Sequence, residues 1–210
     1  MILAVVSLAL FLAFFFCGCL KPKEKPLERA ERLVLKGDAA SIQEAIVALR
    51  EAQQADPQEV RVPALLGTAY MTEARNEQNR DKSEERYNLA IAELEKTVEL
   101  RGQTGATADA YRQLVDVCHE RALLPRRFNV ERDVKLGVGP WEVKAMEKAI
   151  KALEEGHAHF PEDPAFDVGK AKALQKELVT FKALYVENAQ RAWSSRPSGF
   201  VSPETYKRVH

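Results

Sequence analysis

Three segments of the chain share one helical spacing. Residues 45–57 read AIVALREAQQADP, residues 90–102 read AIAELEKTVELRG, and residues 149–161 read AIKALEEGHAHFP. Small residues let two helix axes approach closely, a large apolar residue fills the gap between them, and Pro or Gly then ends the helix. We interpret each segment as the second helix of a tightly packed pair. The order small, large, small, helix end recurs as Ala45, Leu49, Ala52, Pro57; Ala90, Leu94, Thr97, Gly102; and Ala149, Leu153, Gly156, Pro161.

The segments that precede the second and third copies have the pattern of a first helix. Apolar or small residues recur there at i, i+3, i+4 and i+7, which is one face of a helix. These positions are Pro63, Leu66, Gly67 and Tyr70, and then Tyr111, Leu114, Val115 and Cys118.

With both halves in place, residues 26–175 resemble the tetratricopeptide repeat family. The resemblance implies an all-α solenoid of antiparallel helix pairs, and binding of other proteins before catalysis. Pro63 and Tyr111 stand where the family usually has Trp, Val115 stands where it has Gly, and Thr97 and Gly102 replace Ala and Pro. The linkers between repeats are also longer than the family's, so we expect degenerate repeats, closed by a long C-terminal helix that covers the end of the stack.

The composition fits one compact domain and excludes some partners. The chain has 210 residues, 46% of them hydrophobic, and 31 basic against 31 acidic residues. This is enough for one core, and the neutral balance argues against a nucleic-acid binder. Alternating apolar and polar residues are absent over any length, so we expect almost no sheet.

The N-terminus is a separate element. Residues 1–20 contain no charged side chain and end in Phe16-Cys17-Gly18-Cys19-Leu20. The apolar length is that of a signal-peptide core, and a Cys after Gly resembles the lipobox of bacterial lipoproteins. The resemblance implies a signal peptide over 1–18 and acyl chains on Cys19. Cys17 fits less well, because the bulky Phe16 would occupy the cleavage position. Phe16 also stands where Leu is usual, and no Lys or Arg precedes the apolar core.

The alternative for this segment is an uncleaved transmembrane helix. Twenty apolar residues can just span a bilayer, and Lys21, Lys23 and Lys25 would then keep the domain in the cytoplasm. For a lipoprotein, Leu20 in place of Asp implies the outer membrane, with the domain facing the periplasm. Residues 19–26 contain two prolines and form a tether.

Capping and breaking residues predict the helices of a domain over 27–193, followed by a flexible tail over 194–210. We expect a capping box of Ser41 and Glu44, a cap at Asp81 or Ser83, and a Pro-initiated helix after Gly139. Residues 126–139 form a long connection, interpreted as an excursion that covers the edge of the repeats or as a functional loop. The expected helices are 27–36, 41–55, about 60–80, 81 or 83 to 100, 107 or 109 to 124, 140–160 and 163–193. In the last of these, one apolar stripe contains Leu174, Leu178, Phe181, Leu184 and Tyr185.

No catalytic motif is present. Cys118 and His119 are adjacent and point about 100° apart on a helix, and His157 and His159 face nearly opposite ways. We therefore expect neither a metal nor a cofactor, no small-molecule substrate, and no enzyme. Cys118 falls on an apolar helix face and is interpreted as a core residue.

The partner-binding residues are predicted from the resemblance, in which the first helix of each pair lines the groove. The alternative is that these are ordinary solvated positions. We expect a membrane-anchored scaffold or assembly factor of the bacterial envelope; the alternatives are a cytoplasm-facing adaptor and an accessory subunit of an envelope enzyme. The residues are Arg61, Thr68, Met71, Arg112, Asp116 and His119.

Overall fold

The computed structural model describes residues 25–104, 108–128 and 138–194. Over these residues the chain is all-α, without strands, which confirms the all-α part of the predicted fold. A short 3-10 helix, η2, spans Pro164–Phe166. The α-helices are α2 (Pro26–Lys36), α3 (Ala39–Ala55), α4 (Arg61–Asn76), α5 (Arg80–Thr104), α6 (Ala108–Phe128), α7 (Pro140–His159) and α8 (Val168–Ser194).

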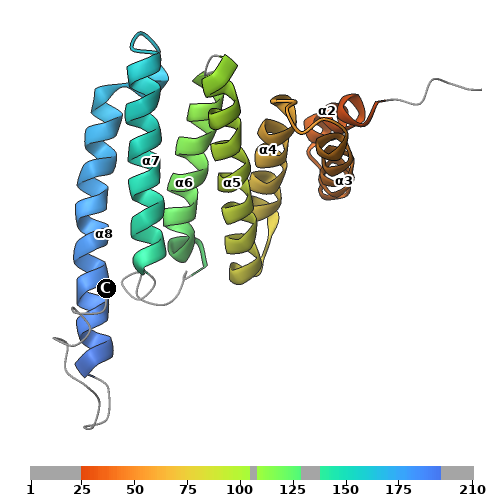
Figure 1. Ribbon diagram of the computed structural model, residues 1–210. Helices are drawn as coiled ribbons and strands as arrows, with labels where there is room; N and C mark the ends of the chain where they lie inside the picture. The colour runs from red at the N-terminus through yellow and green to blue at the C-terminus, as the bar shows by residue number, and fades with distance from the viewer. Residues whose placement is uncertain (1–24, 105–107, 129–137, 195–210) are drawn as a thin grey trace, which may run out of the picture.

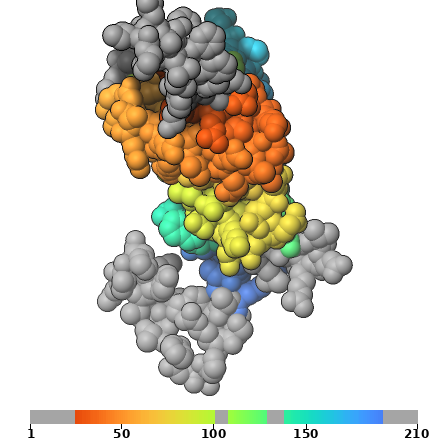
Figure 2. All heavy atoms as spheres, turned by 90° about the vertical axis from the view of Figure 1, so that its right-hand side faces the viewer, coloured from red at the N-terminus to blue at the C-terminus, as the bar shows by residue number. Residues whose placement is uncertain are grey.

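The helices lie side by side in chain order, with α2 and α3 at one end and α8 at the other (Figure 1). Packing is most extensive within α2–α3, α4–α5 and α6–α7, and less extensive between α3 and α4, α5 and α6, and α7 and α8. Figure 2 views the molecule from the α2–α3 end, with the yellow surface of the α4–α5 pair beyond these two helices. The chain therefore folds as three helix pairs followed by α8.

The repeated spacing occupies the contacts within these pairs. Its large residues Leu49, Leu94 and Leu153 are all buried, as are the small residues on either side of each. A Cβ atom added at Gly67 of α4 would lie 2.5 Å from Cγ of Leu94 of α5. The absence of a side chain at Gly67 is thus what lets α4 and α5 approach across Leu94.

The start of α3 corrects the predicted cap. Asp38 is the N-cap: its Oδ1 accepts from the backbone N of Ser41 at 3.0 Å, and its Oδ2 accepts from the Ser41 hydroxyl at 2.7 Å. The predicted capping box of Ser41 and Glu44 is wrong, and Glu44 pairs with Arg29 instead. The hydrogen bond from the Ser41 backbone, followed by that from its hydroxyl, lowers the pKa of Asp38.

The start of α5 also differs from the prediction. The helix begins at Arg80, where Oδ1 of Asn79 accepts from the backbone N of Lys82 at 3.1 Å. Asp81 lies inside the first turn, and the Ser83 hydroxyl donates to a carbonyl oxygen of α4 at 2.8 Å. Neither Asp81 nor Ser83 is therefore the cap.

Helix α4 ends at Asn76, one turn before the predicted end near Arg80. The last carbonyl groups of a helix have no partner inside it. Here the guanidinium of Arg127, from the end of α6, supplies the partners. It donates to the carbonyl oxygens of Ala74 at 2.8 Å, Arg75 at 2.7 Å and Glu77 at 2.6 Å.

The contact of Arg127 with α4 also explains why α6 continues through Pro125. The prediction ended this helix near Leu124, whereas it continues through Pro125 to Phe128. Proline inside a helix removes one hydrogen bond and strains the preceding turn. The burial of Leu124 and Pro125 and the bonds of Arg127 to α4 hold the last turn in place. Similarly, α5 runs through Gly102 to Thr104, because Gly weakens a helix by only about 1 kcal/mol and need not end it.

The long last helix begins later than predicted. Asp163 caps η2 rather than α8, its Oδ1 accepting from the backbone N of Ala165 at 2.9 Å. This 3-10 turn places the buried Phe166 against Gly156, where an added Cβ would lie 2.5 Å from the Phe166 ring. Tyr111 of α6 meets that ring edge-on, with centroids 6.4 Å apart. The chain turns here so that Phe166 can enter the core.

The predicted stripe of α8 is largely buried. Phe181 is fully buried, and Leu174, Leu178 and Leu184 pack partly against the core, whereas Tyr185 is exposed. Since α8 packs chiefly against α7, it lies at the end of the row of helices, as expected of a terminal helix.

Several predictions concern residues outside the described ranges. These are the signal peptide over 1–18, the lipid attachment residue Cys19, most of the tether, residues 129–137 of the long connection, and the tail from 195. None of the helices within the described ranges is long and apolar enough to cross a membrane.

Candidate partner-binding face

Three alternate helices, α4, α6 and α8, are linked side by side by polar contacts. The Thr68 hydroxyl of α4 lies 3.1 Å from Oε1 of Gln113 of α6. His119 of α6 lies with its Nε2 3.2 Å from Oε2 of Glu177 of α8. We call the surface of these helices the α4–α6–α8 face. It contains the first helices of the second and third pairs.

A bidentate ion pair links the end of α4 to α6 on this face. Arg75 donates from Nε and Nη2 to the carboxylate of Glu120 at 2.8 and 2.5 Å, and the Tyr87 hydroxyl donates to the same carboxylate at 3.1 Å. Burial, the largest single influence, raises the pKa of Glu120, but the hydrogen bond and charge of Arg75 outweigh it and the pKa is lowered. Burial and the negative Glu120 raise the pKa of Tyr87 to about 12. The pair is therefore fixed in its ionised form at neutral pH.

Asp116 and His119 stand beside this pair. Asp116 is exposed as a residue, yet loss of water around its carboxyl group raises its pKa, and the charge of Glu120 raises it further. His119 shares Glu177 with Arg126, whose Nη1 lies 3.0 Å from Oε1 of that carboxylate. His119 is thus held between α6 and α8, and Asp116 is the less restrained acceptor.

Arg61 and Arg112 are also engaged within the protein. Arg61 donates to Glu59 at 3.0 and 3.1 Å and to Glu31 of α2 at 3.2 Å. Arg112 pairs with Asp109 at 2.6 Å and with Asp163 at the start of η2. Both guanidinium groups remain partly exposed, so they present oriented positive charge at the surface.

Met71 does not belong to the surface. It is only 7% exposed and packs in the main apolar core with Leu66, Leu94 and Leu114. Contact with a partner is therefore not available to Met71, and we omit it from the face. Of the six predicted residues, Asp116 and His119 lie beside the Arg75–Glu120 pair and Thr68 contacts Gln113, while Arg61 and Arg112 are held by contacts of their own.

The sequence contains a signal for the Arg75–Glu120 pair that the periodicity of the apolar residues alone does not show. Leu66 and Leu114 occupy matching positions of the two repeats, 48 residues apart. The side chains that bridge α4 and α6 are 45 residues apart, as in Arg75–Glu120 and Thr68–Gln113. A search for opposite charges one helical turn short of the repeat length would have found Arg75 and Glu120.

The side chains that this face presents are polar and charged. Across residues 25–104, 108–128 and 138–194, no group of three His, Cys, Asp or Glu side chains is arranged to hold a metal ion. The face instead combines fixed charges of both signs with Thr68 and Gln113. No protein-family model, no curated protein and no solved structure matches this chain.

Proposed function

We propose that this protein is a lipid-anchored scaffold or assembly factor of the bacterial envelope, with a helical-repeat domain that binds partner proteins. The observation that carries this proposal is the burial of the repeated spacing at matching positions of α3, α5 and α7. It supports a solenoid of tetratricopeptide type, and the α4–α6–α8 face is then its binding groove. Such repeats stack into extended surfaces that fit protein or peptide partners.

Membrane attachment would hold the domain close to the bilayer. The first described helix begins at Pro26, seven residues after Cys19. At the extended reach of about 3.5 Å per residue, a tether of this length spans at most about 25 Å. The several acyl chains of a lipoprotein give stable anchoring, and Leu20 in place of Asp favours the outer membrane.

The contacts of the face support a preorganised binding site. Because Glu120 is fixed by Arg75 and Tyr87, and Arg112 by Asp109 and Asp163, ordering these side chains costs little when a partner arrives. Complementary charges would then orient the partner and raise its association rate.

The anchor is tested by expressing the protein in a bacterium supplied with labelled palmitate, beside Cys19→Ala. We expect label in an outer-membrane fraction and its loss in Cys19→Ala. An unlabelled full-length protein in the inner membrane would replace the lipoprotein by an anchored, cytoplasm-facing adaptor.

The face is tested by placing a photo-reactive phenylalanine at Asp116, with the same substitution at the exposed Glu51 of α3 as the control. We expect a discrete crosslinked protein from position 116 and none from 51. Equal crosslinking from both positions, or none from 116, would show that this face is ordinary solvated surface.

A further inference from the structure

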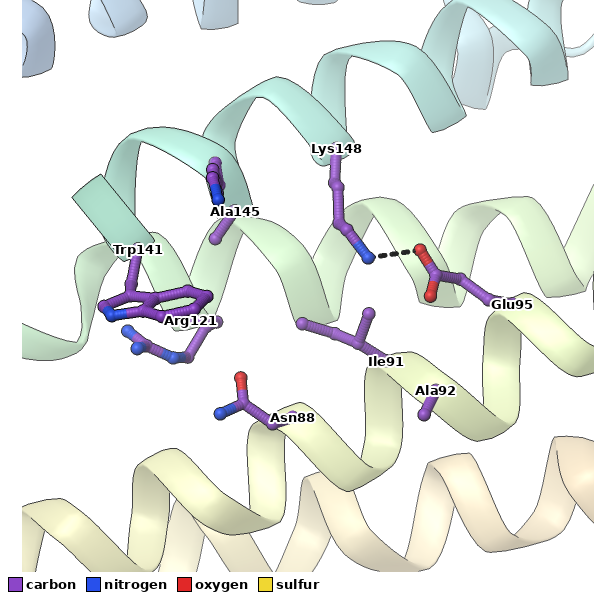
Figure 3. A pocket seen from close by; sticks show the side chains of 9 residues that line it. Asn88, Ile91, Ala92, Glu95, Arg121, Trp141, Ala145 and Lys148 are labelled. Atoms are coloured by element: carbon purple, nitrogen blue, oxygen red, sulfur yellow. Dashed lines mark hydrogen bonds and ion pairs between the residues drawn. The ribbon is translucent and has the colours of Figure 1, made fainter. Parts of the chain in front are cut away.

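A pocket of about 250 Å³ lies between α5 and α7, on the side of the helix row away from the α4–α6–α8 face. Ile91 and Ala92 of α5 and Ala145 of α7 give it apolar walls, and α6 lies behind them (Figure 3). Trp141 stands at one end and Lys148, paired with Glu95 at 2.5 Å, at the other. This volume is below the roughly 300–1,000 Å³ typical of small-molecule sites, and it suits a single large side chain.

The buried Arg121 of α6 supplies a hydrogen-bond donor without a partner. It is only 2% exposed; its Nη1 donates to Glu142 at 3.0 Å and its Nη2 pairs with Glu84. Its Nε–H, by contrast, has no partner among the described residues. Figure 3 shows this side chain between Trp141 and Asn88, at the end of the pocket where Trp141 stands. Buried donors are nearly always satisfied, so this enclosed Nε–H lacks an acceptor, and an incoming acceptor reaches it only when the side chains around it move.

Glu142, in the first turn of α7, holds Arg121 in place. Oε2 of Glu142 accepts from the backbone N of Gly139 at 2.8 Å, which caps the helix, while Oε1 holds Arg121. One carboxylate thereby holds the guanidinium and caps the helix turn that contains Trp141.

The rim adds an aromatic surface and a positive charge. Trp141 is 64% exposed, which is unusual for so large an apolar side chain. Nζ of Lys144 lies 5.0 Å from the Trp141 ring centroid, and within the described residues no carboxylate pairs with it. Lys144 is therefore the charge at this site that an external acid can neutralise.

The charges around the pocket decide which hydrogen-bond acceptors it can bind. The carboxylates of Glu84 and Glu142 already neutralise Arg121, so a neutral carbonyl is the better partner for its Nε, and a second buried carboxylate is not. At the exposed rim, Lys144 favours a negative charge. A backbone carbonyl beside an acidic side chain is what a peptide offers.

We propose that the α5–α7 pocket binds an acidic peptide segment of a partner protein. One apolar side chain of the segment fills the space between Trp141 and Ala145, and a neighbouring carboxylate pairs with Lys144. The backbone carbonyl of the segment accepts from Nε of Arg121 as the side chains that enclose this atom move aside. This site goes beyond the proposed function, because it lies on the other side of the domain and depends neither on the lipid anchor nor on the α4–α6–α8 face.

The test uses the full chain in detergent with Trp193→Phe, so that Trp141 is the reporting tryptophan. The probes are short capped peptides with a central Leu, Ile, Met or Phe flanked by Asp and Glu, beside matched peptides with Asn and Gln. Binding is measured by calorimetry and by Trp141 fluorescence. We expect at least one acidic peptide to bind about tenfold or more tightly than its amide counterpart, and to shift the Nε–H resonance of Arg121.

Variants separate this site from general charge attraction. Lys144→Glu and Trp141→Ala should each weaken binding about tenfold or more, whereas Lys176→Glu, on the exposed surface of α8, should leave it unchanged. Saturable binding absent up to about 1 mM for every acidic peptide would overturn the proposal. Equal affinity for the amide peptides, an unmoved Arg121 resonance, or an equal loss in Lys176→Glu would do the same.

Discussion

Gly67→Ala is the sharpest test of the packing that the repeated spacing creates. The added Cβ would lie 2.5 Å from Cγ and 2.8 Å from Cδ2 of Leu94, which is fully buried. Cγ is the branch point of that side chain, so the contact can be relieved only by moving Leu94 or separating α4 from α5. Overpacking of this kind costs about 1–3 kcal/mol, and the higher helix propensity of Ala returns about 1 kcal/mol.

Because Leu94 is enclosed on all sides, we expect the upper half of that range and a net loss of about 1–2 kcal/mol of unfolding free energy. For a domain of this size, that loss lowers the melting temperature by about 2–8 °C. Urea unfolding followed by circular dichroism measures the free energy, and calorimetry measures the temperature. Gly169→Ala is the matched control, since its added Cβ meets only the carboxylate of Asp167, and it should be neutral or slightly stabilising.

A double variant isolates the contact from other effects. Leu94→Ala alone removes a fully buried leucine and should cost about 2–5 kcal/mol. In Gly67→Ala/Leu94→Ala the new methyl group enters space that Leu94 has left, so the combined loss should be smaller than the sum by about 1 kcal/mol or more. A neutral Gly67→Ala, or strictly additive losses, would refute the close approach of α4 and α5 at this point.

Three further predictions concern other contacts. Because the pKa of Glu120 is lowered in the folded state, its carboxylate stabilises the fold above the unfolded pKa near 4.5, and this stabilisation is lost as the pH falls from that value through the folded pKa. Arg75→Met should flatten this pH dependence of the unfolding free energy measured in urea. An unchanged profile would contradict the role given to Arg75. Burial raises the pKa of Cys118 to about 12, so with the other two cysteines replaced by alanine, a thiol reagent at pH 8 should react only on unfolding; fast labelling of the native protein would show an open core. Arg127→Ala removes three donors from the end of α4 and should cost about 1–3 kcal/mol in urea unfolding, and a loss below the error would mean that water replaces the guanidinium.

The helices and their class could be predicted from the sequence because their signals are local. Gly37, with φ of 72°, ends α2 as expected. Asp56 marks the end of α3, and Gly139 marks the start of α7. Periodicity also identified the core face of α8 through Phe181. These features depend on residues within one or two turns of each other.

The remaining boundaries depend on contacts between distant residues. Both Asp38 and Ser41 are good caps, and only the folded geometry selects Asp38. Pro125 is tolerated inside α6 because Arg127 reaches α4, about 50 residues earlier in the chain. The turn η2 replaces the start of a helix because Phe166 enters the space beside Gly156. No local rule contains this information.

The residues of the α5–α7 pocket could not be brought together from the sequence for the same reason. Arg121 and its partners Glu84 and Glu142 lie far apart in the sequence and meet only where α5, α6 and α7 pack.

The charged residues of the α4–α6–α8 face are largely paired within the protein. A partner that bound there would exchange existing contacts and gain mainly orientation and speed of association. The pocket contains an exposed Trp141, an unpartnered Nε–H on Arg121 and a Lys144 that no carboxylate of the described residues pairs with. A partner that covered Trp141 would bury a large aromatic surface, and buried aromatic residues supply much of the binding energy at protein interfaces. Our two proposals therefore assign different roles to the two faces: the first would orient a partner, and the second would supply binding energy.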